Sequence, residues 1–472
     1  MSMLKKMLAL LLALTMVIGL LSACGAETPA PTDGGNKEPV AGNETPTEEE
    51  EFDDWPLTIK VWVCNTGNGY EYLQSCASKF NSMQDKYIVD LSYAGSYQDV
   101  LLKMRTSTAG SRPDIFAADT ESMYVVLAQE DIFVPIQKYV DADNYDMSGM
   151  LSNLQSTYTQ DGAWQAMPLG NTVTGFFYNA DALKAAGIDP RTDLGSYEEI
   201  VAACRTLKSK GYNTPFYLHT SSAFYTFPMT AQGIHYVDNN NGKDGTPTRT
   251  LIGDEGTDAY NATVSFFNSI MTMSQEGLMM PFGTTVADGR AAFANGEMVF
   301  FTEFISSFNT INTAVGGAFE VGFHECPTID AGATNYGQCT GGGCLFLGNN
   351  GDKWKEQGAW EFMKFLMEDE HTAGFAQASG YLPTTTSGYE SASYQSFVAS
   401  EFPTAKYSLE AQQATGESCY NAWLPMFSDF HALCREFYTK AYNRSTSAED
   451  LTKSFAKAFD EVIELYHLSN GG

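Results

Sequence analysis

Short stretches in which every second residue is apolar alternate with stretches in which apolar residues recur every three or four positions. Residues 57–63, Leu-Thr-Ile-Lys-Val-Trp-Val, show the first pattern and predict a strand, and residues 71–81 show the second and predict a helix. The pair of patterns follows twice more, as predicted strands at 88–93 and 114–118 and predicted helices at 97–107 and 121–129. Three strand–helix units in a row predict a mostly parallel sheet.

The same alternation returns after Pro168. A predicted strand at 174–178 is followed by helices at 180–186 and 196–209. Further strands are expected at 298–301, 319–326 and 341–347, and further helices at 258–275, 289–295, 354–367, 370–378, 428–442 and 448–466. Residues 55–472 are too many for one hydrophobic core, so two α/β domains are expected.

The N-terminal segment has the pattern of an export signal. Lys5 and Lys6 precede an apolar run over 7–21, and Leu-Ser-Ala-Cys follows at 21–24. The run is shorter than the roughly 20 residues of a membrane-spanning helix, so a transmembrane anchor is the weaker alternative. Residues 1–23 are therefore predicted to be a lipoprotein signal peptide, and Cys24 is predicted to carry the lipid and palmitate that anchor the chain to the cell membrane.

Composition changes this picture in two respects. Residues 24–54 are rich in Glu, Pro, Thr and Gly, which predicts a disordered acidic tether because such a segment buries little apolar surface. The formal net charge of −30 argues against a nucleic-acid partner, since such a surface repels phosphate.

Eight cysteines besides Cys24 permit disulfides in an exported chain. The pairs Cys339/Cys344 and Cys419/Cys434 are the first to test, and buried free thiols are the alternative. The six histidines show no metal-ligand spacing, and the acidic stretches 141–146 and 238–245 do not fit the calcium-loop pattern. Polar turns are the preferred interpretation of both stretches, and no metal and no cofactor is predicted.

Four motifs occur together, in order, along the part of the chain that follows the tether. They are Pro168-x9-Tyr178-Asn179 with Asp-Ala-Leu-Lys-Ala-Ala-Gly-Ile at 181–188, Ser-Tyr-Glu-Glu-Ile at 196–200, Ala-Phe-x2-Gly-Glu-Met at 292–298, and Ala-x3-Met-Lys-Phe-Leu at 359–366 leading to Gly-Tyr-Leu-Pro at 380–383. In this order they resemble extracellular solute-binding protein family 1, which serves carbohydrate and glycerol-3-phosphate ABC importers.

The resemblance implies an α/β fold of the type II periplasmic-binding-protein kind, in which two hinge-linked lobes enclose a ligand cleft. If the family's crossings apply, residues 55–169 and 305–366 form lobe 1, and residues 170–303 and 367–472 form lobe 2. It further implies an extracytoplasmic protein that delivers a small solute to ABC permease subunits, and a monomer is expected.

Candidate ligand residues come from two arguments. Loops after strands are the usual ligand positions in open α/β sheets, and here they carry aromatics, hydroxyls and amides, which suit a sugar; Phe224, Tyr225 and Trp423 lie in such loops. Resemblance to the glycerol-3-phosphate branch implies contacts from Tyr97, Asp119 or Glu121, Asn171, Thr172, Thr302, Glu303, Gly342, Gly343 and Tyr381. The alternative for each is a packing or turn role.

The ligand class and two rival functions complete the sequence-based interpretation. Ser428 falls where the glycerol-3-phosphate branch has a phosphate-clamping arginine, so a neutral mono- or oligosaccharide is favoured over a glycerol phosphate or phosphodiester. A secreted glycoside hydrolase with two carboxylates is the rival enzyme, but the sequence lacks the Gly-x-Ser-x-Gly, His-Glu-x-x-His and P-loop motifs. A surface adhesin is the third alternative, and we expect a binding protein that is not an enzyme.

Overall fold

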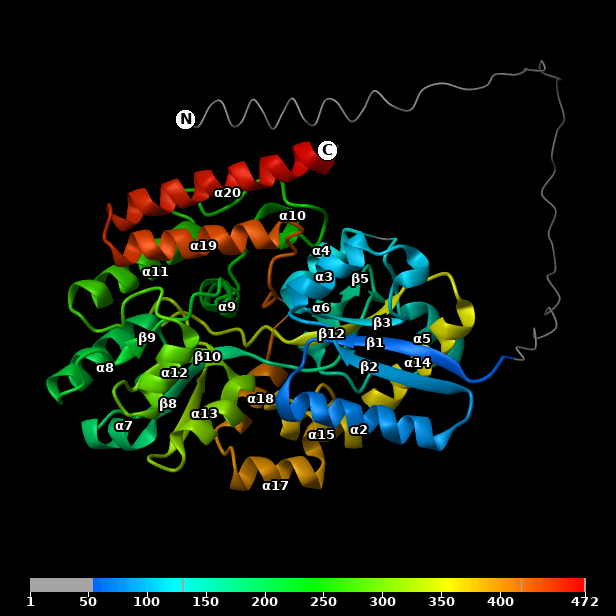
Figure 1. The fold of residues 1–472 in the computed structure, drawn as a ribbon. Helices are drawn as coiled ribbons and strands as arrows, with labels where there is room; N and C mark the ends of the chain where they lie inside the picture. The colour runs from blue at the N-terminus through cyan, green and yellow to red at the C-terminus, as the bar shows by residue number, and fades with distance from the viewer. Residues whose placement is uncertain (1–53, 130, 417, 471–472) are drawn as a thin grey trace, which may run out of the picture. The chain divides into compact units, whose positions relative to one another are not determined.

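Two separate β-sheets organise the chain, and the computed structural model describes residues 54–470 apart from 130 and 417 (Figure 1). The predicted signal peptide, Cys24 and the tether up to residue 53 lie outside the described residues. Within the described part, no helix combines the length and the apolar character needed to cross a membrane.

The first sheet has the strand order β2-β1-β3-β12-β4, with β7 also paired to β12. Its strands are β1 (Leu57–Val63), β2 (Tyr87–Tyr93), β3 (Ile115–Asp119), β4 (Phe133–Val134), β7 (Met167–Pro168) and β12 (Gly343–Gly348). β1 runs parallel to β2 and β3, so the parallel arrangement predicted for the first three strands is confirmed. β12 runs antiparallel to β3, β4 and β7.

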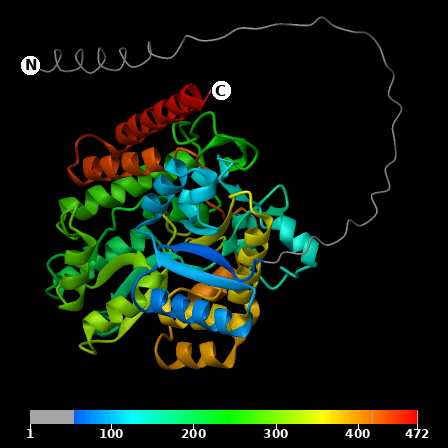
Figure 2. The same cartoon turned by 45° about the vertical axis from the view of Figure 1, so that its right-hand side comes forward.

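Helices cover the first sheet because their apolar stripes match its buried side chains. α2 packs beside β2, and α14 packs on β1 through a face that buries Trp360, Phe362 and Met363 (Figure 2). The helices of this part are α2 (Gly67–Met83), α3 (Tyr97–Thr106), η1 (Ala109–Ser111), α4 (Thr120–Leu127), α5 (Gln137–Asp143), α6 (Ser152–Tyr158), α14 (Lys353–Met367) and α15 (Asp369–Ser379). A two-stranded ribbon of β5 (Thr159–Gln160) and β6 (Ala163–Trp164) accompanies them.

The second sheet has the order β11-β8-β10-β9. Its strands are β8 (Thr174–Asn179), β9 (Phe216–Tyr217), β10 (Phe300–Phe304) and β11 (Val321–Glu325). β8 runs antiparallel to both β10 and β11, and only β9 and β10 are parallel. The repeated strand–helix pattern after Pro168 therefore does not produce a second parallel sheet.

Helices also surround the second sheet, and the long helices α11, α19 and α20 pack against one another (Figure 1). Phe266, Phe430, Phe455 and Phe459 are almost fully buried among them. The helices are α7 (Ala180–Ala186), α8 (Tyr197–Ser209), α9 (Ala223–Ala231), α10 (Asp238–Asn241), α11 (Asp258–Gln275), α12 (Val286–Ala294), η2 (Ile305–Ser307), α13 (Phe308–Val315), α16 (Thr386–Glu390), α17 (Ala392–Ser400), α18 (Ala405–Gln413), α19 (Phe427–Tyr442) and α20 (Ala448–Asn470).

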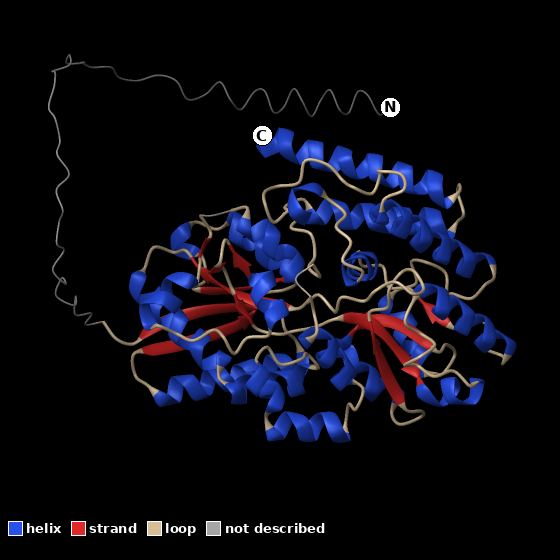
Figure 3. Cartoon of the chain, turned by 180° about the vertical axis from the view of Figure 1, so that it is seen from behind, coloured by secondary structure: helices blue, strands red, loops and turns tan. Residues whose placement is uncertain are grey.

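Three chain segments lie side by side where the two sheets are joined (Figure 3). The amides of Leu169 and Gly170 donate to the carbonyl of Gly343 at 2.9 and 3.0 Å, and Thr172 and Gly341 exchange both backbone bonds. Asn171 and Leu382 exchange a further pair. These paired segments form the hinge between the lobes.

Part of the segment 305–366, which the sequence analysis assigned to lobe 1, packs with the second sheet. β11 joins the second sheet by pairing with β8. Phe308 and Ile311 of α13 belong to one hydrophobic cluster with Phe177 and Phe301 of that sheet. β11 and α13 thus pack with the second sheet, where their apolar residues are buried. The chain returns to the first sheet at the hinge segment 341–343.

Candidate functional site

A cavity of about 620 Å³ opens between elements of the two lobes. The first lobe contributes the loop after β1, the first turn of α2, the start of α3 and the end of α15 with Tyr381, and the second contributes η2 and α13. Its lining consists of Cys64, Asn65, Thr66, Gly67, Asn68, Gly69, Tyr97, Ser306, Asn309, Thr310, Thr313, Ala378, Ser379 and Tyr381. None of these described lining residues carries a formal charge.

Two tyrosines that are far apart in sequence meet at this cavity. Tyr97 is the first residue of α3, where Ser96 and Asp99 form a capping box that fixes the turn. Tyr381 follows Gly380, whose φ of 84° ends α15 and whose missing side chain leaves room for the carbonyl of Ser306. The two phenol groups lie close enough to influence each other's pKa, and Tyr381 also stacks on Phe375 with ring centroids 5.8 Å apart.

Burial raises the pKa of both Tyr97 and Tyr381 above the ordinary phenol value. Both rings are therefore neutral at physiological pH, and each hydroxyl can donate one hydrogen bond and accept others. A flat apolar face beside a neutral hydroxyl suits a ligand that has both C–H surfaces and hydroxyl groups.

The first turn of α2 supplies backbone donors to the same cavity. α2 begins after Thr66, whose side chain makes no cap bond, and its first turn holds no acidic residue. The orphan amides of this turn are consequently not satisfied by a capping side chain. Gly67 and Gly69 line the cavity here and allow a ligand to approach the backbone closely. The side-chain oxygen of Asn65 is buried without a protein partner.

Four predicted ligand residues lie in the hinge and do not line the cavity. The Asn171 side chain is fully buried; its amide nitrogen donates to Gln412 at 2.9 Å and its oxygen accepts from Gln412 and Thr340 at 2.8 and 2.7 Å. The Thr172 hydroxyl accepts from the Ser306 amide at 3.4 Å.

The two remaining hinge residues are glycines with crowded surroundings. Gly342 has φ of 109°, and a Cβ there would come within 2.3 Å of the Gly170 carbonyl oxygen. A Cβ on Gly343 would come within 2.8 Å of the Tyr97 hydroxyl. This pair therefore sets the close approach of the hinge segments and the position of Tyr97.

Asp119 and Glu121 lie at the end of β3 and the start of α4. Asp119 caps α4 by accepting from the Ser122 amide at 2.6 Å. Burial raises the pKa of both carboxyl groups, and the neighbouring Asp119 raises that of Glu121 further, well above its usual range. Glu121 acts electrostatically on Tyr438 of α19, so it lies toward the second lobe. Neither carboxylate lines the 620 Å³ cavity.

Thr302 and Glu303 lie on β10 in a separate polar cluster. The Thr302 hydroxyl donates to the Tyr217 carbonyl at 2.9 Å and accepts from the His219 amide at 2.7 Å. Glu303 is 4% exposed and lies 3.8 Å from Arg290 and 3.9 Å from His219. Burial raises the pKa of Glu303 to about 7, although the Phe304 amide and Arg290 oppose the shift, and burial lowers that of His219 to about 4.

The three aromatic residues predicted from their loops have different surroundings. Phe224 packs against His219 and Phe304 with ring centroids 5.0 and 5.5 Å away. The Tyr225 hydroxyl is buried in the second lobe and bonded to Thr263 at 2.7 Å, so in this conformation it contributes to the core.

Trp423 lies between the lobes but at another cavity. Its ring packs 5.3 Å from that of Tyr124 in α4, and it lines a cavity of about 230 Å³ that Lys243 and Gln160 also line. Its indole nitrogen is buried without a protein partner. Of the thirteen predicted ligand residues, Tyr97 and Tyr381 alone line the larger cavity.

The sequence interpretation did not single out the part of the lining that α13 supplies. Asn309, Thr310 and Thr313 lie on α13, which the interpretation left without an assigned structure. The signal was present, because Phe308, Ile311 and Val315 recur at helical spacing and are buried, which leaves the polar residues on the other face.

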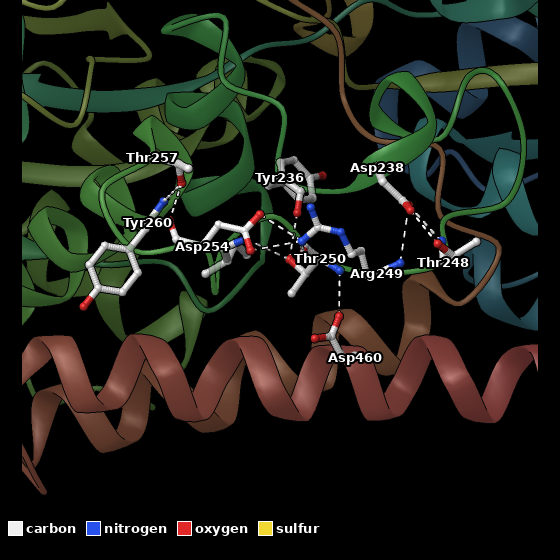
Figure 4. A network of polar contacts seen from close by, with 10 residues as sticks. Tyr236, Asp238, Thr248, Arg249, Thr250, Asp254, Thr257, Tyr260 and Asp460 are labelled. Carbon is white, nitrogen blue, oxygen red and sulfur yellow. Dashed lines mark hydrogen bonds and ion pairs between the residues drawn. The ribbon is translucent and has the colours of Figure 1, made fainter.

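The acidic stretch at 238–245 forms a hydrogen-bonded turn (Figure 4). The Asp238 carboxylate accepts from the backbone amides of Thr248 and Arg249 at 2.8 and 3.3 Å. Arg249 in turn pairs with Asp254 at 2.8 Å. Protein donors thus occupy the Asp238 carboxylate, and among the described residues no group of three or more His, Cys, Asp and Glu side chains could hold a metal ion.

The structure brings together neither of the cysteine pairs named as first to test, because the two members of each pair lie in different clusters, and all eight cysteines of the described part are free thiols in this conformation. Cys344 lies in the core of the first sheet and Cys339 in a different cluster of the second lobe. Cys434 lies on α19 in the core of the long helices, while Cys419 belongs to the cluster of Cys339.

Comparison with known proteins agrees with this architecture. A family model described as bacterial extracellular solute-binding protein matches residues 75–404. The chain is 27% identical over 351 residues to the sn-glycerol-3-phosphate-binding periplasmic protein UgpB of Yersinia pestis bv. Antiqua, a match that covers 72% of this chain and 76% of the relative. UgpB of Brucella melitensis is 25% identical over 340 residues, covering 70% and 75%.

Solved structures show the same fold. The sugar-binding protein MalE of Xanthomonas citri superposes with a TM-score of 0.71 at 16% identity, over 88% of this chain and 99% of that chain. The GacH receptor of Streptomyces glaucescens, solved unliganded and with acarbose, gives 0.69 at 18% identity over 87% and 99%. UgpB of Mycobacterium tuberculosis in complex with glycerophosphocholine gives 0.69 at 17% identity over 88% and 100%.

The two-lobed α/β fold and the extracytoplasmic role predicted from the sequence motifs are thereby confirmed. The family model covers well over half of the sequence, and the matched relatives are periplasmic binding proteins. The chain belongs to the bacterial extracellular solute-binding proteins.

Proposed function

We propose that this protein captures a neutral mono- or oligosaccharide between its lobes and delivers it, unaltered, to the permease subunits of an ABC importer. The observation that carries the proposal is the uncharged lining of the 620 Å³ cavity, where hydroxyls, amides and two tyrosine rings converge from both lobes. A neutral sugar matches this lining, because its hydroxyls need directional partners and its C–H faces pack on rings.

The absence of charge also bears on the alternative ligand. A phosphate dianion in a closing cleft calls for a fixed cation or several amide donors, and no described residue of the lining is Lys, Arg or His. One observation favours a glycerol phosphate or phosphodiester nevertheless: the first turn of α2 leaves its amides without a capping side chain. The names of the UgpB relatives agree with that second candidate.

In this proposal Tyr97 and Tyr381 contact the ligand directly, together with the polar residues of α13 and of the α2 turn. Asn171, Thr172, Gly342 and Gly343 hold the hinge segments on which Tyr381 depends. Asp119, Glu121, Phe224, Tyr225, Thr302, Glu303 and Trp423 stay predicted ligand residues, and substitution of each in the binding assay tests them.

The lobes close on the ligand by a change at the hinge. The paired segments 169–172, 341–343 and 382 are the place where backbone torsions would change, since they join the two sheets. Ligand bound to one lobe gains contacts from the other on closure, which shifts the equilibrium toward the closed form that a permease recognises. The lobe boundaries that follow are 55–169 with 343–381, and 170–342 with the residues from 382 onward.

A screen by thermal shift and calorimetry tests the ligand class. The panel contains mono- and oligosaccharides, glycerol 3-phosphate and glycerophosphodiesters, and each incubated ligand is analysed afterwards by mass spectrometry. We expect one sugar to raise the unfolding free energy by about 2.7 kcal/mol at a hundred times its dissociation constant and to be recovered intact. Binding of the phosphates alone would replace the sugar by the second candidate, and cleavage of a glycan would show an enzyme.

We also propose that the chain acts as a monomer anchored to the cell membrane by lipid on Cys24. The support is the sequence at 21–24 and the export signal before it. Labelling of the exporting cells with a fatty-acid analogue should mark the wild-type chain. Cys24→Ser should abolish the label and release the protein from the membrane fraction, and an unlabelled wild-type chain would contradict the anchor.

A further inference from the structure

Three cysteines that are far apart in sequence gather in one small cluster of the second lobe. Cys326, Cys339 and Cys419 are between 2% and 3% exposed and pack with Ala223 and Phe227. The other described cysteines do not share this arrangement: Cys204, Cys344 and Cys434 are each buried among larger apolar residues of the main cores. A buried cluster of three thiols in an exported protein calls for an explanation.

Within the cluster, Cys339 lies close enough to Cys419 for the two thiols to influence each other electrostatically. The Thr230 hydroxyl lies 3.1 Å from the Cys339 sulfur. Cys326 has a partner of its own, because its thiol donates to the Pro327 carbonyl at 3.6 Å. These contacts favour Cys339 and Cys419 as the pair and leave Cys326 as the remaining thiol.

The backbone around the pair is already held in place. The Gln338 amide donates to the Thr415 hydroxyl at 3.0 Å, and the Gly416 amide donates to the Tyr336 carbonyl at 2.8 Å. The Cys419 amide donates to the Gly416 carbonyl at 3.0 Å. The two segments that carry the cysteines thus run side by side, so a bond between the sulfurs would need little movement of the chain.

The compartment favours oxidation of such a pair. Disulfides form and persist outside the cytoplasm, where the family to which this chain belongs acts. The buried thiols are not accessible once the protein has folded, so oxidation would take place while the exported chain folds.

We propose that Cys339 and Cys419 form a disulfide in the exported protein and that Cys326 stays a free thiol. The Cys339 residue lies immediately before the hinge segment that begins at Thr340, and the segment after Cys419 leads to Trp423 between the lobes. The bond would fix the second-lobe end of the hinge segment relative to the chain that reaches the first lobe.

The chemistry is a thiol–disulfide exchange with a disulfide-bearing oxidant, such as glutathione disulfide or a dithiol oxidoreductase. One cysteine thiolate attacks the oxidant and forms a mixed disulfide, which releases one oxidant thiol. The second cysteine then attacks the mixed disulfide, so that the protein S–S bond forms and the second oxidant thiol leaves. The two protein thiols lose two protons and two electrons in total, and the oxidant disulfide gains both.

Peptide mapping of the full-length chain tests the proposal. The protein, purified from exporting cells or refolded with glutathione disulfide, is alkylated in denaturant without reductant, digested with chymotrypsin and sequenced by tandem mass spectrometry. We expect a linked peptide pair that joins Cys339 to Cys419, about 2 Da lighter than the two reduced peptides, and alkylated Cys326. Alkylation of both Cys339 and Cys419, or linkage of either one to another cysteine, would overturn the proposal.

Single serine variants test whether the linked peptide pair has been assigned to the correct cysteines. Cys326→Ser and Cys344→Ser should keep the linked pair, whereas Cys419→Ser should lose it and leave Cys339 alkylated. Reduction of the folded wild-type protein should lower its melting temperature by about 5 °C, because a bridge that closes so long a loop constrains the unfolded chain. An unchanged melting temperature in a sample that shows the linked pair would contradict the stabilising role.

Discussion

At the scale of single residues, Tyr97 and Tyr381 are the side chains that connect the sequence motifs with the cavity. Tyr381 belongs to the Gly-Tyr-Leu-Pro motif at 380–383, and Tyr97 opens the helix after the second strand. Both could be proposed from sequence because each lies in a recognisable turn. That the two side chains meet could not be proposed from sequence, since nothing local in the sequence relates the end of α15 to the start of α3.

Two substitutions of Tyr381 should distinguish the contribution of its ring to ligand affinity from that of its hydroxyl. Tyr381→Ala removes both the flat face and the hydroxyl, so we expect at least a tenfold loss of ligand affinity, equivalent to about 1.4 kcal/mol. Tyr381→Phe keeps the face and should lose less. Calorimetric titration with the ligand from the screen measures both.

Tyr139→Phe is the matched control, because its hydroxyl donates to Glu356 at 2.8 Å in the first lobe and does not line the cavity. We expect its ligand affinity to equal that of the wild type and its unfolding free energy to fall by about 1 kcal/mol. Equal affinities for Tyr381→Ala and the wild type would remove Tyr381 from the site.

Glu303 should make stability depend on pH. Its pKa in the folded protein is raised to about 7, so the folded state binds more protons than the unfolded state between about pH 4.5 and pH 7. The contribution of Glu303 to the unfolding free energy should therefore fall by about 3 kcal/mol as pH rises through this window, whereas His219, whose pKa is lowered to about 4, contributes in the opposite sense between about pH 4 and pH 6.5. Urea unfolding at a series of pH values measures the slope.

Glu303→Gln should remove this contribution. The plot of its unfolding free energy against pH should therefore lack the fall of about 3 kcal/mol that Glu303 contributes in the wild type. The control is Glu297→Gln, which makes the same substitution at an exposed position. Parallel curves for Glu303→Gln and the wild type would show that Glu303 keeps an ordinary pKa.

At the scale of elements, helices with caps and a polar face were predictable. α7 and α11 have the predicted bounds, since Asn179 and Thr257 accept the first-turn amides. The sequence interpretation missed α9 because all nine of its residues are buried and Pro228 lies inside it, which leaves no polar face and no helical period. The direction of β8 relative to its neighbours could not be predicted from the sequence either, because its antiparallel pairing with β10 and β11 involves segments that are distant in sequence.

The hinge depends on Gly342 for a backbone that other residues adopt with strain. Gly342→Ala would place a methyl group 2.3 Å from the Gly170 carbonyl oxygen at φ of 109°. We expect a loss of about 3 kcal/mol of unfolding free energy and weaker ligand binding, because the hinge segments must separate. Urea unfolding and calorimetry measure the two effects.

Gly296→Ala provides the comparison for backbone strain without crowding. Gly296 has φ of 73° and no atom within 4 Å of the added Cβ. We expect a loss of about 1 kcal/mol and an unchanged affinity. If both variants lose the same stability and keep wild-type affinity, the close packing of the hinge segments has no part in binding.

At the scale of the whole molecule, the family and the two lobes were predictable from ordered motifs, but the lobe boundary near residue 305 was not. The motifs predict helices and strands but do not indicate which sheet each one joins. The sequence analysis therefore assigned β11 and α13 to lobe 1, whereas they pack with the second sheet. The cavity lies between those same elements and the first turn of α2, and its polar α13 residues were missed for the same reason.

The central claim is that a hydroxyl-rich solute lies intact between the lobes in the uncharged cavity. A crystal structure of the full-length protein with the tightest ligand of the screen tests it most directly. The account predicts an unaltered ligand between the first turn of α2 and α13, in contact with Tyr97 and Tyr381, and lobes that have closed about the hinge. A ligand found outside this cavity, or a cleaved ligand within it, would contradict the account.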